Sequence, residues 1–234
     1  MEVPSGRAPR AVLFDAYGTL FDVYSVAVMA ERLFPGFGER LGILWRDKQI
    51  EYTRLSSMSG RIRSFRDCTR AGLRYAAARF GLTLSEGAEH ELMQAYERLA
   101  PFPENHGVLV ELQRRGIRAG ILSNGDPDML EAVVRHAGFA GLVDPLLSVE
   151  GTGRFKTDPA AYALGTRAFG LAAADILFVS SNCWDAIGAT WSGYTTLWIN
   201  RFQLPLDELG ARPTRIGTQL IDVLDFFASQ GSSP

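Results

Sequence analysis

Five short, mostly apolar runs in the chain are each bounded by turn-forming residues. These runs are residues 11–14, 117–122, 145–149, 175–179 and 195–199. Continuous apolar runs of this length are typical of strands buried on both faces of a parallel sheet. After residue 100 the runs alternate with segments of helical spacing, over 104–115, 127–138, 159–169 and 184–192. This alternation predicts an α/β fold whose core is a Rossmann-like parallel sheet covered by helices.

Residues 22–100 follow a different pattern, because their apolar positions recur at helical spacing without strand-like alternation. The pattern predicts helices over 24–34, 38–58, 64–80 and 85–99. The first strand therefore belongs with the later part of the chain, and the helical block is an insertion. We expect an α/β core domain made of residues 1–21 and 101–234, with residues 22–100 as a helical cap near the carboxyl end of the first strand.

The composition excludes several classes of protein. The 234 residues are 47% hydrophobic with a net charge of −2, and no basic cluster predicts a nucleic acid or an anionic membrane as partner. Cys68 and Cys183 lie in no CxxC or Cys/His pattern, which argues against a disulfide framework or a zinc site. No apolar run reaches the length of a membrane span, and the first residues lack the apolar core of a signal peptide. We expect a cytoplasmic protein.

Polar residues follow four of the predicted strand ends or lie near them. They are Asp15, then Ser123 and Asn124, then Lys156, then Ser180, Asn182 and Asp185. Each alone has an ordinary structural explanation, as a helix N-cap, a turn aspartate or a surface lysine. Together they lie at the edge where open parallel sheets bind ligands. The three histidines, His90, His106 and His136, fall in predicted helices away from this edge.

This order of residues resembles the haloacid dehalogenase superfamily, which includes many phosphatases. The resemblance covers the strand-end residues and the inserted helical cap. The phosphatases carry a second acid two residues after the nucleophilic aspartate, where this chain has Tyr17, and an acidic pair for magnesium near Asn182. Magnesium prefers carboxylate oxygens, so both departures predict a site without a metal ion.

The same departures resemble the L-2-haloacid dehalogenases within that superfamily. Similar segments span nearly the whole chain, at residues 15–23, 34–36, 44–53, 99–102, 121–125, 134–138, 178–185 and 198–201. The resemblance implies hydrolytic removal of halide from short L-2-haloalkanoic acids, with water as co-substrate and D-2-hydroxy acids as products. It also implies an ester on Asp15 formed with inversion at C2, no cofactor and a homodimer.

The resemblance further implies a role for each site residue. Arg46 and Asn124 bind the leaving halide, whereas Ser123, Lys156 and the backbone amides from Ala16 onward bind the substrate carboxylate. Thr19 orients Asp15, and Ser180, Asn182 and Asp185 position and activate the hydrolytic water. Tyr17 and Trp184 line the site, although ordinary aromatic packing explains them nearly as well. Tyr162 supports Lys156.

Two residues depart from the L-2-haloacid dehalogenase pattern. Thr157 follows Lys156 where proline is usual, and Asp47 stands beside Arg46 where an uncharged residue is common. Two other functions also stay open on the same fold: a metal-dependent phosphatase and a catalytically silent binding protein. Tyr17 and Asn182 argue against the first, and the joint presence of the charged and polar site residues argues against the second.

Overall fold

A parallel sheet of six strands forms the centre of the computed structural model, which describes residues 8–231. The predicted core domain therefore extends at both termini beyond the described residues. The strands are β1 (Ala11–Phe14), β2 (Arg118–Ser123), β3 (Leu146–Ser148), β4 (Ile176–Ser180), β5 (Thr195–Ile199) and β6 (Arg215–Gly217). Their order is β3-β2-β1-β4-β5-β6, and every neighbouring pair is parallel. The predicted α/β fold with a parallel sheet is confirmed.

The central strand β1 is fully apolar, as its continuous hydrophobic run predicted. All four residues of β1 are completely buried, and β1 pairs with β2 on one side and β4 on the other. In this register Phe14 lies beside Ile121 and Val179. The polar residues that follow the three strands therefore meet at one edge of the sheet.

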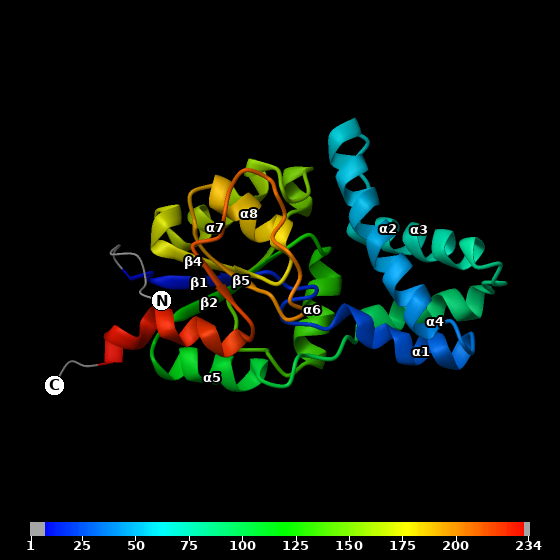
Figure 1. Ribbon diagram of the computed structural model, residues 1–234, viewed down its shortest axis with the longest axis horizontal. Coiled ribbons are helices and arrows are strands. Elements are labelled where there is room, and N and C mark those ends of the chain that lie inside the picture. Colours follow the sequence, from blue (N-terminus) through cyan, green and yellow to red (C-terminus); the bar gives the residue numbers. More distant parts are fainter. Residues whose placement is uncertain (1–7, 232–234) are drawn as a thin grey trace.

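Helices cover both faces of the sheet. They are α5 (Asn105–Arg114), α6 (Pro127–His136), α7 (Pro159–Phe169), α8 (Cys183–Trp191) and the 3₁₀ helix η4 (Leu220–Gly231). In Figure 1, α7 and α8 lie above the strands, whereas α5 and η4 lie below them. Short 3₁₀ turns, η2 (Glu150–Thr152) and η3 (Ala173–Asp175), lie in the connections. None of the described helices is long and apolar enough to cross a membrane.

Four of the α-helices between β1 and β2 pack on one another beside the sheet (Figure 1). They are α1 (Ala27–Leu33), α2 (Gly38–Ser59), α3 (Phe65–Arg79) and α4 (Glu86–Tyr96). The predicted first helix begins instead as a 3₁₀ turn, η1 (Val23–Val26), and the Asp22 carboxylate caps this turn by accepting from the Tyr24 amide. The predicted fourth helix ends at Tyr96, three residues earlier than expected, and Leu99 is already buried in the core.

Two chain segments connect these four helices to the sheet, and they run side by side. The Asp22 amide donates to the Ala100 carbonyl at 2.8 Å. The Asn105 side chain, which is fully buried, donates to the carbonyls of Thr19 and Leu20 at 3.2 and 2.9 Å. The chain thus leaves and re-enters the sheet layer at one place, directly after the turn that carries Asp15.

Candidate active site

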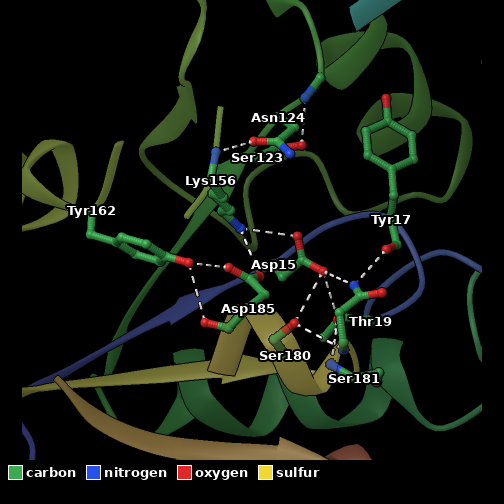
Figure 2. A network of polar contacts seen from close by, with 12 residues as sticks. Asp15, Tyr17, Thr19, Ser123, Asn124, Lys156, Tyr162, Ser180, Ser181 and Asp185 are labelled. Atoms are coloured by element: carbon green, nitrogen blue, oxygen red, sulfur yellow. Dashed lines mark hydrogen bonds and ion pairs between the residues drawn. The ribbon is translucent and has the colours of Figure 1, made fainter. Parts of the chain in front are cut away.

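The Asp15 carboxylate lies at the carboxyl end of β1 and is held by four hydrogen bonds (Figure 2). Three of them reach Oδ2. Their donors are Thr19 Oγ1 at 3.0 Å, Ser180 Oγ at 3.3 Å and Asn182 Nδ2 at 2.8 Å. Oδ1 accepts one hydrogen bond, from Lys156 Nζ at 3.0 Å. The side chain is buried, so its orientation is fixed and bulk water is largely kept away from it.

The Lys156 ammonium group bridges two buried carboxylates. Its Nζ lies 3.0 Å from Asp15 Oδ1 and 3.0 Å from Asp185 Oδ2. Burial alone lowers the pKa of Lys156, but the two carboxylates outweigh burial and the pKa is raised, so the lysine is charged. Burial raises the pKa of Asp185 to about 6, against the opposing effect of Lys156. Tyr162 Oη donates to Asp185 Oδ1 at 2.8 Å, so the structure connects Tyr162 to Lys156 through Asp185.

The turns after β1 and β4 lock these side chains together. Thr19 Oγ1 accepts from the Ser181 amide at 2.8 Å while donating to Asp15. The Ala16 carbonyl accepts the Leu20 amide at 2.9 Å and closes the first turn. Gly18 has a φ of +95°, a conformation that side chains with a Cβ rarely adopt. The tight turn brings Thr19 back within hydrogen-bonding distance of the Asp15 carboxylate.

The end of β2 contributes Ser123 and Asn124. Ser123 Oγ accepts from the Gly125 amide at 3.0 Å, and Asn124 Oδ1 accepts from the Lys156 amide at 2.9 Å. Asn124 therefore holds the loop that carries Lys156, a contact that the sequence did not predict. Because its oxygen is engaged in this way, Nδ2 is the atom through which Asn124 can bind a halide or another anion.

Arg46 reaches this edge of the sheet from α2. Its guanidinium is buried, and Nη2 donates to the Tyr17 carbonyl at 3.1 Å. Asn182 Nδ2 donates to the same carbonyl at 3.2 Å, so one backbone oxygen joins the arginine to the network around Asp15. Arg46 Nη1 donates to Gln49 Oε1 at 2.7 Å. Gln49 was not among the residues predicted from the sequence.

Aromatic side chains enclose the site. The Tyr17 ring packs against Phe65 and Tyr96, with centroids 5.1 and 5.5 Å away. Burial raises the pKa of Tyr17 well above its usual value, so its hydroxyl is neutral; that hydroxyl has no hydrogen-bond partner among the described residues. The Trp184 ring lies 4.9 Å from the guanidinium of Arg54 and is half-buried.

A cavity of about 390 Å³ opens between α2 and the end of β4. Arg46, Asn182 and Trp184 line it, and so does Asp47, which is exposed. Asn182 also donates to Asp15, so the cavity lies next to the buried carboxylate. A volume of this size accommodates a small organic acid.

The two carboxylates at this edge are bridged by a cation of the chain itself. In the part of the chain that the structure describes, no three His, Cys, Asp or Glu side chains are grouped as a metal site. Thr157, which stands in place of the usual proline, follows Lys156 through a cis peptide bond. Lys156 is nevertheless held at both ends, by Asn124 at its amide and by the two carboxylates at Nζ.

Comparisons with known proteins point to one family. The haloacid dehalogenase-like hydrolases match residues 9–193. An (S)-2-haloacid dehalogenase of Pseudomonas sp. (strain YL) is 44% identical over 218 residues, which cover 93% of this chain and 94% of that protein. A crystal structure of an L-2-haloacid dehalogenase is 54% identical with a TM-score of 0.92, covering 95% of this chain and all of the other. The structure of L-2-haloacid dehalogenase from Xanthobacter autotrophicus with chloropropionic acid covalently bound is 35% identical, with a TM-score of 0.88 and coverage of 96% and 100%.

Proposed function

Because the chain belongs to the haloacid dehalogenase-like hydrolases, we propose that it is an (S)-2-haloacid dehalogenase. It removes halide from short L-2-haloalkanoic acids and releases D-2-hydroxy acids. The observation that carries this proposal is the environment of Asp15: one oxygen is held by three donors, the other by Lys156 alone, and the buried Arg46 lies beside the same turn.

In the first step, Asp15 attacks C2 of the substrate. Oδ2 is engaged by Thr19, Ser180 and Asn182, so we assign the attack to Oδ1, which keeps more lone-pair density. The new bond joins Oδ1 to C2, and the carbon–halogen bond breaks with its electron pair leaving on the halide. Attack from the face opposite the halogen inverts C2. Burial makes the carboxylate a better nucleophile, because it is not solvated by bulk water.

The leaving halide needs hydrogen-bond donors on the far side of C2. Arg46 and Asn124 Nδ2 are the groups that we propose for this role, since donors aimed at developing charge lower the barrier most. The substrate carboxylate then binds to Ser123, Lys156 and the backbone amides that follow Asp15. Tyr17 and Trp184 exclude water from the reacting carbon.

In the second step, water attacks the carbonyl carbon of the Asp15 ester. The bond between that carbon and Oδ1 breaks, so Oδ1 leaves as the hydroxyl of the D-2-hydroxy acid. The water oxygen stays in the carboxylate of Asp15. We propose that Ser180, Asn182 and Asp185 position and activate this water, with the charge of Lys156 balancing the cluster.

Residues 22–100 act in this proposal as a cap over the sheet edge, since they supply Arg46. Two further proposals concern the whole protein. The free, buried thiols of Cys68 and Cys183 support a cytoplasmic location, because such thiols are typical of reducing compartments. The family resemblance supports a homodimer, which sedimentation analysis would test.

A single turnover in ¹⁸O-labelled water tests the ester mechanism. With enzyme in excess over L-2-chloropropionate, we expect the label in the peptide that contains Asp15 and unlabelled oxygen in the new hydroxyl. If Asp15 instead activates water as a general base, the label appears in the hydroxy acid alone. Both routes invert C2, so only the isotope position separates them, and label confined to the product would rule out the ester.

A further inference from the structure

The buried guanidinium of Arg46 is surrounded by neutral acceptors. It donates to Gln49 Oε1 at 2.7 Å, to Tyr96 Oη at 3.5 Å and to the Tyr17 carbonyl at 3.1 Å. Only 8% of the residue is exposed, and among the described residues no carboxylate forms an ion pair with it. Buried arginines are usually paired with an acid. Burying the Arg46 guanidinium without such a partner therefore costs desolvation free energy.

Gln49 is the residue best placed to hold this arginine. It is completely buried one turn after Arg46 on α2, and its Oε1 accepts from both Arg46 and Tyr96 Oη, the latter at 2.8 Å. The orientation of its amide is determined, because a guanidinium can only donate and must face the oxygen. Its Nε2 donates to Thr69 Oγ1 at 2.6 Å, and that hydroxyl donates onward to the Phe65 carbonyl.

The contacts of Gln49 join three helices of the cap. Arg46 and Gln49 come from α2, Thr69 from α3 and Tyr96 from α4. Burial raises the pKa of Tyr96, against the effect of Arg46, so Tyr96 remains a neutral donor to Gln49. A neutral amide therefore fixes the guanidinium without cancelling its charge.

We propose that Gln49 is a positioning residue for halide release, which holds Arg46 in place and leaves its full positive charge for the departing halide. This inference rests on the proposed function. A carboxylate in the place of Gln49 would keep the hydrogen bond but neutralise the cation. An apolar side chain at position 49 would leave the charge of Arg46 intact, but it would remove the hydrogen bond that positions the guanidinium. Both changes weaken the stabilisation of the halide in the transition state.

The test compares Gln49→Glu and Gln49→Met with wild type in single-turnover halide release, so that ester hydrolysis does not mask the first step. The substrates are L-2-chloropropionate and L-2-bromopropionate. Chloride is smaller and concentrates the developing charge, so it depends more on a fixed cationic donor than bromide. We expect chloride release to slow by about tenfold or more in both variants, in line with the loss of one positioned donor. Bromide release should slow less.

Thr53→Val is the matched control. Thr53 is another buried polar residue of α2, but its hydroxyl donates to the Ile50 carbonyl of its own helix. Its loss should leave the ratio of chloride to bromide rates unchanged. Circular dichroism and thermal unfolding establish that each variant is folded. If Gln49→Met does not fold, Gln49→Glu remains the test, because it retains an acceptor for Arg46 and Tyr96.

Two outcomes separate the proposals. If folded Gln49 variants lose chloride and bromide turnover equally, or lose neither, Gln49 does not position Arg46 for the halide and the inference is wrong. If wild type itself releases no halide from either substrate, the proposed function is wrong instead. A lower ratio of chloride to bromide rates in the Gln49 variants, with a normal ratio in Thr53→Val, supports the inference, and a higher ratio contradicts it.

Discussion

A single ammonium group, that of Lys156, bridges two carboxylates in the interior of this protein. Its Nζ contacts Asp15 and Asp185 at 3.0 Å each, and all three side chains are buried. We expect Lys156→Met to lower the free energy of unfolding by about 3–5 kcal/mol, because it leaves buried charges uncompensated. Urea unfolding measures the loss.

The double variant Lys156→Met with Asp185→Asn separates stability from function. Asp185→Asn removes one of the two buried carboxylates that Lys156→Met leaves without a cation. It should therefore restore part of the lost unfolding free energy, whereas halide release should stay undetectable. Recovery of activity together with stability would mean that Lys156 serves the fold alone. An unstable double variant would contradict the electrostatic explanation of the single one.

The raised pKa of Asp185 makes a second prediction at the residue scale. Burial raises this pKa from its ordinary value of 3.8 to about 6 in the folded protein. Between these values the folded state binds more protons at this site than the unfolded state, so its contribution to stability falls as pH rises from 4 to 6. We expect the unfolding free energy of wild type minus that of Asp185→Asn to fall across this window and then level off. A flat difference would contradict the assigned pKa.

The sequence predicts the polar residues of the site but not the surrounding side chains that hydrogen-bond to them. Asp15, Lys156 and Asp185 follow or lie near strand ends, and parallel strands bring their ends together, so their meeting was predictable. Gln49 and Tyr96 lie in helices with an amphipathic pattern, and neither residue belongs to a recognisable motif. Their contacts with Arg46 form only because three helices pack together around it. The hydrophobic pattern of a sequence does not predict such side-chain contacts between helices.

At the scale of elements, one aspartate connects α3 to the sheet. Asp126, in the loop after β2, accepts the amides of Phe65 and Arg66 at 2.8 Å each. These are first-turn amides of α3, which need an external acceptor. Asp126→Ala should lower the unfolding free energy by about 1–2 kcal/mol, as the loss of a helix cap does. It should also slow halide release, because Phe65 packs on Tyr17.

Asp128→Ala is the matched control for Asp126. Asp128 lies two residues away and pairs with the Arg66 side chain at 2.7 Å, but 71% of its side chain is exposed. Exposed ion pairs contribute little, so denaturant unfolding and halide release should both stay near wild type. Equal losses in the two variants would mean that the link through the backbone amides of α3 has no special role.

The elements that the sequence missed lack the periodicity on which prediction depends. The strands predicted at 11–14, 175–179 and 195–199 agree with β1, β4 and β5 within one residue, because their apolar runs are continuous. Strand β6 has three residues at the sheet edge, none of them buried, and carries no such run. Helix η4 is a 3₁₀ helix, whose three-residue turn does not produce the spacing of an α-helix.

For the molecule as a whole, the arrangement of charge favours a small carboxylate over a phosphate ester. At the sheet edge Lys156 offsets one of the two charges of Asp15 and Asp185, and α2 adds a second buried cation, Arg46, so these four side chains carry no net charge. A haloacid brings only a single negative charge to this neutral set. A phosphate dianion would need further positive charge, and the residues at positions 17 and 182, Tyr17 and Asn182, are not the carboxylates that bind magnesium well.

Removal of metal ions should therefore leave the enzyme active. After dialysis against EDTA, we expect halide release from L-2-chloropropionate at the rate of the untreated protein, with no increase when magnesium is added. We also expect no phosphate release from p-nitrophenyl phosphate, with or without magnesium, because position 17 offers a tyrosine where an acid would have to protonate the leaving oxygen. Loss of halide release on dialysis, reversed by magnesium, would place a metal ion in the reaction. Magnesium-dependent phosphate release would instead favour a phosphatase built on this fold, since Asp15 and Lys156 alone are compatible with either chemistry.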